Sequence, residues 1–366
     1  MFPEEMKAKV MEPEYDFLET RPELGNNIIL LGVGGSHAYG TNVEGSDLDI
    51  RGVATNRRES IITGNRFEQS VDTTTDTTIY SFEKLISLLC NCNPNIVEIL
   101  GLKAEHYLYI SHFGKLLLKH RHIFLSKRAI NSFGGYANSQ LRRLENKASR
   151  TASQEQEEHF ILRSIESAQY DFKRRYFEHP EDAIRLYIDK AIHDGYETEI
   201  FMDVVLKHYP LRDYKDMVSE MQSIIKSYKS IGRRNENALS HGKIAKHMMH
   251  LVRLYLMCLD ILEKGEIITY REKDHDLLMD IRNGKYLDDN DQPVPAFYDM
   301  VNDLEHSLEY WKAHTSLPDA PDMKMINSLL YTANSEICSR GSNRFIGDVS
   351  FHDWRIRNQD VLMPAT

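Results

Sequence analysis

The chain has 366 residues, of which 41% are hydrophobic, and its formal net charge at pH 7 is −10. Its length corresponds to about two domains with ordinary buried cores, and the excess of acids excludes a protein that coats nucleic acid nonspecifically. The acidic N-terminus differs from a signal peptide and no long apolar run occurs, so we expect a soluble, cytoplasmic protein. The spacing of the four cysteines does not fit a zinc site, and we expect reduced thiols.

The N-terminal part alternates short β-type runs with turn residues. Predicted strands cover residues 27–33 (NIILLGV), 47–54 (DLDIRGVA) and 77–81 (TTIYS), and they are separated by loops rich in Gly, Asn, Ser and Thr. Apolar residues then recur at helical spacing over 82–89, and a shorter helix is expected around 96–100. This pattern indicates a small unit with a mixed sheet.

Beyond about residue 110 the β signals nearly vanish and amphipathic patterns predict helices. These helices are expected over residues 123–147, 154–175, 180–193, 214–231 and 240–262. Near the end, residues 342–353 fit either a short hairpin or an extended tail that packs back on the body. The fold class is therefore α+β, with the mixed-sheet domain over residues 1–110, a helical domain over 111–340 and a tail over 341–366.

Two carboxylates, Asp47 and Asp49, open the second predicted strand. Side chains alternate across a strand, so Asp47, Asp49 and Arg51 should share one face while Leu48 and Ile50 are buried on the other. Like charges this close are unfavourable unless a cation neutralises them, and hard oxygen ligands suit Mg²⁺ or Mn²⁺. The pattern therefore predicts a divalent metal site. Arg51 could orient Asp49, meet a phosphate oxygen, or form a plain salt bridge.

A glycine-rich turn precedes these acids. It fits neither the dinucleotide fingerprint, which would need a glycine where His37 stands, nor a P-loop, which would need Lys-Ser or Lys-Thr where Thr41-Asn42 stand. Glycines at 34 and 35 allow close approach to a phosphate, and the amides at the start of a helical turn can donate to an anion. Ser36 adds a hydroxyl donor.

The segment GSHAYGTNVEGSDLDIRGV, with NPNIVEIL downstream, resembles the DNA polymerase beta superfamily of nucleotidyltransferases. Within it, the chain looks most like the RNA-repair-associated polymerase-beta-like family of bacteria and phages. The resemblance implies that Gly35 and Ser36 hold the triphosphate and that Asp47 and Asp49 bind metal. It also implies a third carboxylate on a neighbouring strand, a role for which Asp76 is favoured and Asp72 is the rival, because Asp72 stands in a Thr-rich loop where a turn explains it.

The resemblance implies transfer of an NMP from an NTP to an acceptor hydroxyl, with release of pyrophosphate and two Mg²⁺ (or Mn²⁺) ions held by Asp47, Asp49 and Asp76. Residues 1–110 would then be the nucleotidyltransferase domain, and residues 111–340 would wall its cleft. An RNA end such as a cleaved tRNA is favoured as acceptor; a free nucleotide, a small antibiotic and a protein hydroxyl stay open. The alternative from another class is a nucleotide-binding regulator or toxin–antitoxin partner without turnover.

Two basic stretches in the helical part could contact phosphates. Lys243, Lys246, His250 and Arg253 share one helical face, of which Lys246, His250 and Arg253 are assigned to nucleotide binding. Residues 111–150 carry nine Lys and Arg against one acid, Glu145. Each stretch fits either a phosphate-binding wall or a solvated helix face.

Overall fold

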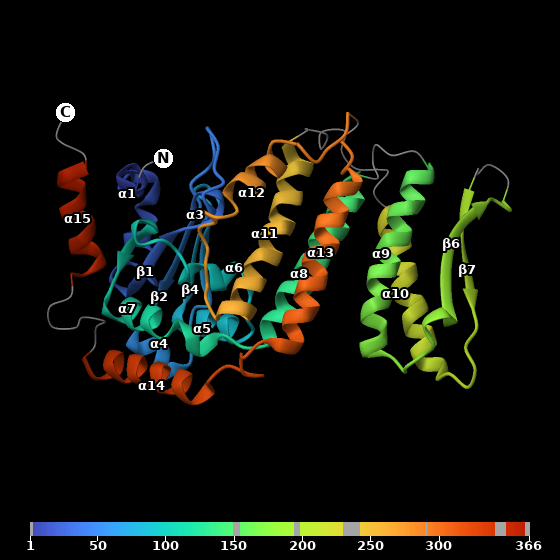
Figure 1. Cartoon of the computed structure of the whole chain (residues 1–366). Helices are drawn as coiled ribbons and strands as arrows, with labels where there is room; N and C mark the ends of the chain where they lie inside the picture. Colours follow the sequence, from blue (N-terminus) through green and yellow to red (C-terminus); the bar gives the residue numbers. More distant parts are fainter. Residues whose placement is uncertain are drawn as a thin grey trace. The chain divides into compact units, whose positions relative to one another are not determined.

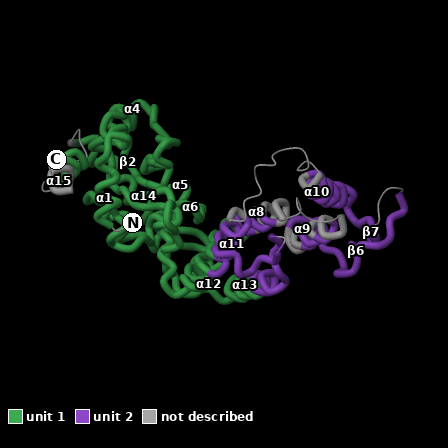
Figure 2. Tube along the Cα trace, turned by 90° about the horizontal axis from the view of Figure 1, so that it is seen from above, with its two compact units in different colours: residues 1–135, 253–279, 303–366 green, residues 136–252, 280–302 purple. Residues whose placement is uncertain are grey.

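The structure of the chain, a computed structural model, describes residues 3–148, 154–193, 198–229, 242–289, 291–340 and 349–362. It divides into two compact units, drawn in green and purple in Figure 2. Unit 1 comprises residues 1–135, 253–279 and 303–366, and unit 2 comprises residues 136–252 and 280–302. Unit 1 thus joins the N-terminal residues to two later stretches of the chain. The expected functional division at residues 110 and 340 does not coincide with these limits and stays a prediction.

Unit 1 contains a five-stranded sheet with the order β3-β4-β2-β1-β5. The strands are β1 (Ile28–Val33), β2 (Ile50–Ala54), β3 (Gln69–Asp72), β4 (Thr77–Ser81) and β5 (Tyr107–Ile110). β2 and β4 run parallel and the other neighbours are antiparallel, so the sheet is mixed, as the sequence predicted. Every residue of β1 is buried, which accounts for its uninterrupted apolar sequence. β3 and β5 were not predicted.

Helices make up most of the remaining chain, which confirms the predicted α+β class. Figure 1 shows their order along the chain. They are α1 (Pro3–Val10), α2 (Phe17–Thr20), α3 (Gly35–Tyr39), α4 (Arg58–Thr63), α5 (Phe82–Cys90), α6 (Pro94–Val97), α7 (His112–Lys119), α8 (Arg128–Ala148), α9 (Gln154–Arg175), α10 (Leu211–Lys229), α11 (Gly242–Lys264), α12 (His275–Arg282), α13 (Pro295–His314), α14 (Met323–Arg340) and α15 (Phe351–Leu362).

The helix α5 lies where the apolar spacing over residues 82–89 predicted a helix. The Ser81 hydroxyl accepts a hydrogen bond from the Lys84 amide at the N-terminus, and the apolar residues Phe82, Leu85 and Leu89 are buried. The helix contacts β2 and β4, whereas α7 contacts β1 and β5. The side chains that point away from the acids, such as Leu48 and Ile50, pack instead with residues of α1, α2 and α15.

One predicted helix is a strand. Residues 180–193 contain β6 (Ile184–Lys190), which pairs in antiparallel fashion with β7 (Thr198–Val204). The apolar residues of β6 alternate with period two, so Ile184 and Leu186 pack together against α9 and α10 in one cluster, whereas a helix would scatter them. Figure 1 shows this hairpin beside α9 and α10, all within unit 2.

The C-terminal segment is also different from the expected hairpin or extended tail. Residues 342–348 lie outside the described chain, and residues 351–362 form the helix α15, which lies beside α1 (Figure 1). Phe351 is fully buried against the ring of Tyr109, with ring centroids 5.3 Å apart. Arg355 is buried and forms an ion pair of 2.6 Å with Asp16. The helix therefore belongs to the core of unit 1.

Within the described part of the chain, every helix is too short or too polar to span a lipid bilayer.

Replacing Phe351 should destabilise unit 1, because Phe351→Ala leaves a cavity among Tyr109, Trp354 and the sheet. We expect a loss of about 3–5 kcal/mol in the free energy of unfolding, measured by denaturant titration. The exposed Ile356 on the same helix is the control, since Ile356→Ala should change stability by about 0.5 kcal/mol or less. Equal stability of the two variants would contradict the placement of α15.

Candidate active site

The glycine-rich turn lies where β1 ends. Gly34 precedes α3, a helix of five residues, and Gly35 adopts a left-handed φ of +56° at its first position. Gly40, with φ of +75°, ends the helix. Left-handed backbone at both ends is readily available only to glycine, which explains why this short turn is bounded by two of them. Ser36 is half-buried at the second position of the helix.

The carboxylate of Asp49 lies directly against this turn. A Cβ atom at position 35 would stand 1.6 Å from Oδ2 of Asp49, so no other residue fits there with Asp49 in place. The amide of Gly34 donates to the carbonyl oxygen of Asp49 over 2.8 Å, which fixes the two backbones to each other. The turn and the second acid of the Asp-x-Asp pair therefore form one site.

The residues around Asp49 alternate as the sequence predicted. Leu48 and Ile50 are buried in the core of unit 1, whereas Asp47 is exposed and Asp49 half-buried. The strand β2 begins at Ile50, later than expected, and the two acids lie in the extended segment just before it. The carboxylates of Asp47 and Asp49 consequently stand on the open side of the segment.

Asp76 reaches the same end of the sheet through the parallel pairing of β2 with β4. Ile50 is opposite Thr77, so the residues before them, Asp49 and Asp76, are neighbours. The Ile50 amide donates to the carbonyl oxygen of Asp76 over 3.3 Å. Asp76 has a φ of +44°, uncommon for a residue with a side chain, and its side chain is 64% exposed.

Arg51 joins the two acids. Its Nη2 lies 3.8 Å from Oδ1 of Asp49, and its Nη1 lies 3.5 Å from Oδ1 of Asp76. Nη1 also donates to the carbonyl oxygen of Asp76 over 2.7 Å. Of the three uses that the sequence left open for Arg51, the structure shows the ion pair with Asp49, which also orients that acid.

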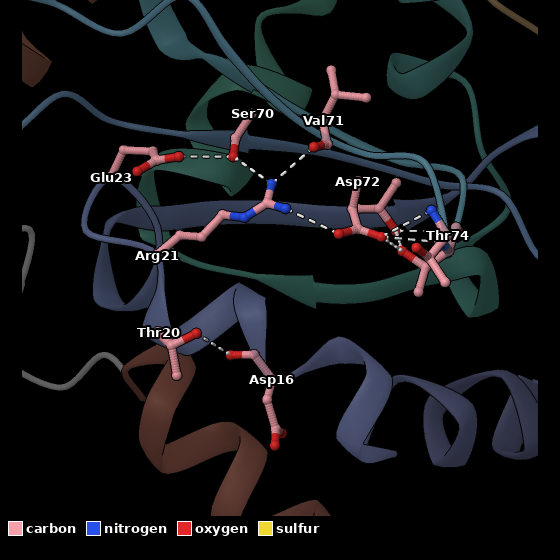
Figure 3. Close-up of polar contacts among 10 residues, drawn as sticks. Asp16, Thr20, Arg21, Glu23, Ser70, Val71, Asp72 and Thr74 are labelled. Carbon is pink, nitrogen blue, oxygen red and sulfur yellow. Dashed lines mark hydrogen bonds and ion pairs between the residues drawn. The ribbon is translucent and has the colours of Figure 1, made fainter.

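Asp72, the rival third acid, is engaged elsewhere (Figure 3). Its Oδ2 pairs with Arg21 over 2.9 Å, and its Oδ1 accepts from the amides of Thr74 and Thr75, each over 3.1 Å. Figure 3 shows that Arg21 also reaches Ser70 and the carbonyl oxygen of Val71. Asp72 thus stabilises the turn between β3 and β4, the turn that ends at Asp76.

The donor chemistry of this site suits a hard cation, since the carboxylates of Asp49 and Asp76 lie at one end of the sheet and Asp47 is two residues from Asp49 in the sequence. Among the described residues, however, no three His, Cys, Asp or Glu side chains converge closely enough to hold a metal ion together. The guanidinium of Arg51, within 4 Å of both Asp49 and Asp76, supplies the positive charge between those two acids. A cation shared by Asp49 and Asp76 would have to displace it.

An open pocket borders the loop between α3 and Asp47. It is lined by Glu5, His37, Asn42, Val43, Glu44, Gly45 and Ser46. The ring Nε2 of His37 lies 3.4 Å from the carbonyl oxygen of Ser46, and burial lowers the pKa of this histidine. The ring of His37 is therefore neutral at neutral pH.

Arg253, assigned to a basic nucleotide-binding face, is buried. Its guanidinium carbon lies 3.6 Å from the centre of the Tyr39 ring, and its Nη1 lies 3.9 Å from Oε2 of Glu98. Tyr39 donates a hydrogen bond to the same oxygen of Glu98. Because a second element covers this side of α11, Arg253 does not form the expected exposed stripe. On the same helix, Lys246 is exposed and His250 half-buried; both belong to unit 2, and their assignment stays a prediction.

Three cations of the basic stretch over residues 111–150 have partners within unit 1. Arg121 and Arg128 donate to the backbone oxygens of Leu100 and Cys90, and Lys127 pairs with Asp319 over 2.8 Å. The side chains of Arg142 and Arg143 lie outside the described part of the chain. The cations at the N-terminal end of this stretch therefore stabilise the packing of unit 1.

Residues 7–175 match the model of a family described as the RNA repair pathway DNA polymerase beta family. The match confirms the family resemblance that the sequence indicated for this region of the chain. The match covers the sheet, the glycine-rich turn and the acids Asp47, Asp49, Asp72 and Asp76, and it supports a nucleotidyltransferase-type function in general. None of the curated proteins and none of the solved structures compared with the chain matches it.

Two residues beside the site were missed by the sequence reasoning, Tyr39 and Glu98. The sequence held one signal for Glu98, because a lone acid inside the apolar run Ile96–Leu100 is more often a paired buried group than a surface one. Tyr39 offered no such signal, since an aromatic residue on a short helix is equally well explained by packing.

Replacing Gly35 should disable the candidate site. Gly35→Ala forces Asp49 to move, and we expect triphosphate affinity, measured by calorimetry, to fall at least about tenfold, the loss of one charge-assisted interaction. Gly64→Ala is the matched control, because Gly64 also has positive φ, +75°, but open space around its Cβ position. Both variants should lose about 1–2 kcal/mol of stability from the backbone alone. Unchanged affinity in Gly35→Ala would contradict the joint site.

Proposed function

We propose that the chain is a metal-dependent nucleotidyltransferase that moves an NMP from an NTP to an acceptor hydroxyl and releases pyrophosphate. The observation that carries this proposal is the contact between the Asp49 carboxylate and Gly35, because it puts the turn that would bind phosphate beside an acid that would bind metal. The family of residues 7–175 supports the same reaction class.

The turn would bind the triphosphate. Gly35 has no side chain to keep an anion away from the backbone, and the amides at the start of α3 can donate to phosphate oxygens. The half-buried hydroxyl of Ser36 adds a donor at the same place. These groups are fixed before the nucleotide arrives, so they would orient the triphosphate at little entropic cost.

Asp47 and Asp49 would hold Mg²⁺ or Mn²⁺, and Asp76 would complete the set. When bound, such ions neutralise the triphosphate and lower the pKa of an acceptor hydroxyl. Arg51 would then exchange its contacts with Asp49 and Asp76 for a phosphate oxygen, which a guanidinium binds well. The exposure of Asp76 leaves it accessible to an acceptor, whereas Asp72 is already occupied by Arg21 and two amides.

The acceptor that we propose is an RNA end, such as that of a cleaved tRNA. The description of the family names an RNA repair pathway, and the exposed Lys246 offers a phosphate contact in unit 2. Arg253 is not part of such a contact surface, because it is buried beside Glu98. The enzyme would act by positioning and electrostatics, without a covalent intermediate on the protein.

Removing either charge of the Asp-x-Asp pair should abolish most of the turnover. We expect Asp47→Asn and Asp49→Asn each to lower the rate at least about 10²-fold, as when a main electrostatic element is lost, while the fold survives. The assay incubates the protein with each labelled NTP, Mg²⁺ and total RNA, and follows label in the RNA fraction.

Near-normal incorporation by either folded variant would contradict the metal-site assignment. Label that appears only in small molecules would contradict the RNA acceptor. Nucleotide binding by the unchanged protein without any turnover would instead favour the nucleotide-binding regulator.

Changing Asp76 or Asp72 to Asn should have different effects on turnover and on the melting temperature. Asp76→Asn should lose turnover by about 10²-fold with an unchanged melting temperature, because its side chain is exposed. Asp72→Asn should lower the melting temperature, because it weakens the ion pair with Arg21, and should keep most of the turnover. The reverse pattern would make Asp72 the third acid.

A further inference from the structure

A cluster of buried polar side chains stands at the C-terminal end of α3, the helix whose N-terminal end carries the glycine-rich turn. Tyr39, Glu98 and Arg253 are each at most 6% exposed, and they come from three elements far apart in the sequence. Tyr39 is the last residue of α3, Glu98 follows α6, and Arg253 lies in α11. Two of the three can carry a charge, which is rare at this depth without a specific partner.

The three side chains contact one another in a single arrangement. The Tyr39 hydroxyl donates to Oε2 of Glu98, and the guanidinium of Arg253 stacks on the Tyr39 ring with Cζ 3.6 Å from its centre. Nη1 of Arg253 lies 3.9 Å from Oε2 of Glu98. Tyr39 is therefore held at both its ring and its hydroxyl.

The segment after α11 contacts the same end of α3, and also the loop of Glu98, through backbone and side-chain groups. The Arg271 amide donates to the carbonyl oxygen of Tyr39 over 3.0 Å. The ring of Tyr270 packs on Gly40, where a Cβ atom would approach it to 2.6 Å. The Thr269 hydroxyl donates to the carbonyl oxygen of Glu98 over 2.7 Å. The loop that contains Glu98 and the C-terminal end of α3 therefore both contact one segment, residues 269–271.

A helix as short as α3 needs such support. It has five residues, Gly34 gives its N-terminus no side-chain cap, and glycines with positive φ stand at positions 35 and 40. Isolated helices of this length do not form in water, and glycine adds to the conformational freedom that folding must remove. The position of Gly35 and Ser36 must therefore come from contacts that α3 makes with the rest of unit 1.

The geometry points to Glu98 and Arg253 as positioning residues that act through Tyr39 to fix α3, and with it the Gly35-Ser36 turn, for the triphosphate. The inference deepens the proposed function and rests on it for the identity of the ligand. Burial raises the pKa of the Tyr39 hydroxyl, which keeps it a hydrogen-bond donor at neutral pH. Burial also raises the pKa of Glu98, and the charges of Arg253 and Arg51 oppose that rise.

Two variants test the inference. Tyr39→Phe removes one hydroxyl and keeps the ring under Arg253, and Arg253→Met removes the stacked cation while the bond from Tyr39 to Glu98 remains. Hydrogen exchange of the amides of residues 35–41 is measured in the nucleotide-free protein, and ATP affinity is measured by calorimetry with Mg²⁺. In both variants we expect exchange at 35–41 to be at least about tenfold faster and ATP affinity at least about tenfold weaker.

The control is Tyr255→Phe. Tyr255 lies on α11 near Arg253 and donates to Glu305 over 2.6 Å, so the variant removes a tyrosine–glutamate bond of the same kind away from α3. It should leave exchange at 35–41 and ATP affinity unchanged.

Exchange at 35–41 that stays at the original rate in both test variants would overturn the inference, even if their melting temperatures fall. Failure of the unchanged protein to bind any nucleotide would refute the proposed function alone, because the exchange comparison needs no ligand and still decides whether Glu98 and Arg253 position α3.

Discussion

The carboxylate of Asp49 occupies the space that a side chain at position 35 would need, and much of the site follows from this contact. It requires glycine at the turn, and it holds the first acid-bearing segment against the end of β1, where the Gly34 amide meets the carbonyl oxygen of Asp49. A phosphate on the turn would lie beside a carboxylate. Two anions can share that place only with a cation between them, and in the proposed function that cation is a divalent metal ion.

The parallel pairing of β2 with β4 brings Asp76, the proposed third acid, to the same end of the sheet. It sets Asp76 beside Asp49, and Arg51 compensates both charges. The pairing depends in turn on the hairpin of β3 and β4, whose turn Asp72 and Arg21 stabilise. The two acids at the ends of this turn therefore differ, since Asp72 accepts hydrogen bonds from the amides of the turn whereas the side chain of Asp76 is exposed. Behind the turn, Tyr39, Glu98 and Arg253 add support from α11, so residues of the helical part complete unit 1.

The sequence predicted the structure correctly where the pattern of neighbouring residues alone determines it. The alternation from Asp47 to Arg51 predicted which side chains are buried, and the uninterrupted apolar run at 28–33 predicted the central strand. The sequence did not predict the structure where contacts between distant segments determine the secondary structure or the burial of a residue. Residues 184–190 form a strand because β7 and α9 lie beside them. Arg253 is buried because its guanidinium packs on the Tyr39 ring and lies beside the Glu98 carboxylate. Helical periodicity describes one element and carries no information about what packs on each face. The ion pair of Asp72 with Arg21 is likewise a contact between distant segments that no local pattern predicts.

The central claim is that the Gly35 turn and the acids bind a triphosphate together with a divalent cation. Calorimetric titration of the unchanged protein with ATP and with GTP, in Mg²⁺ and again in EDTA, tests it most directly. We predict that affinity for at least one nucleotide is at least about tenfold higher with Mg²⁺, because ligand and carboxylates repel each other without it. Equal affinity in Mg²⁺ and in EDTA would contradict the claim and move the triphosphate away from Asp47 and Asp49.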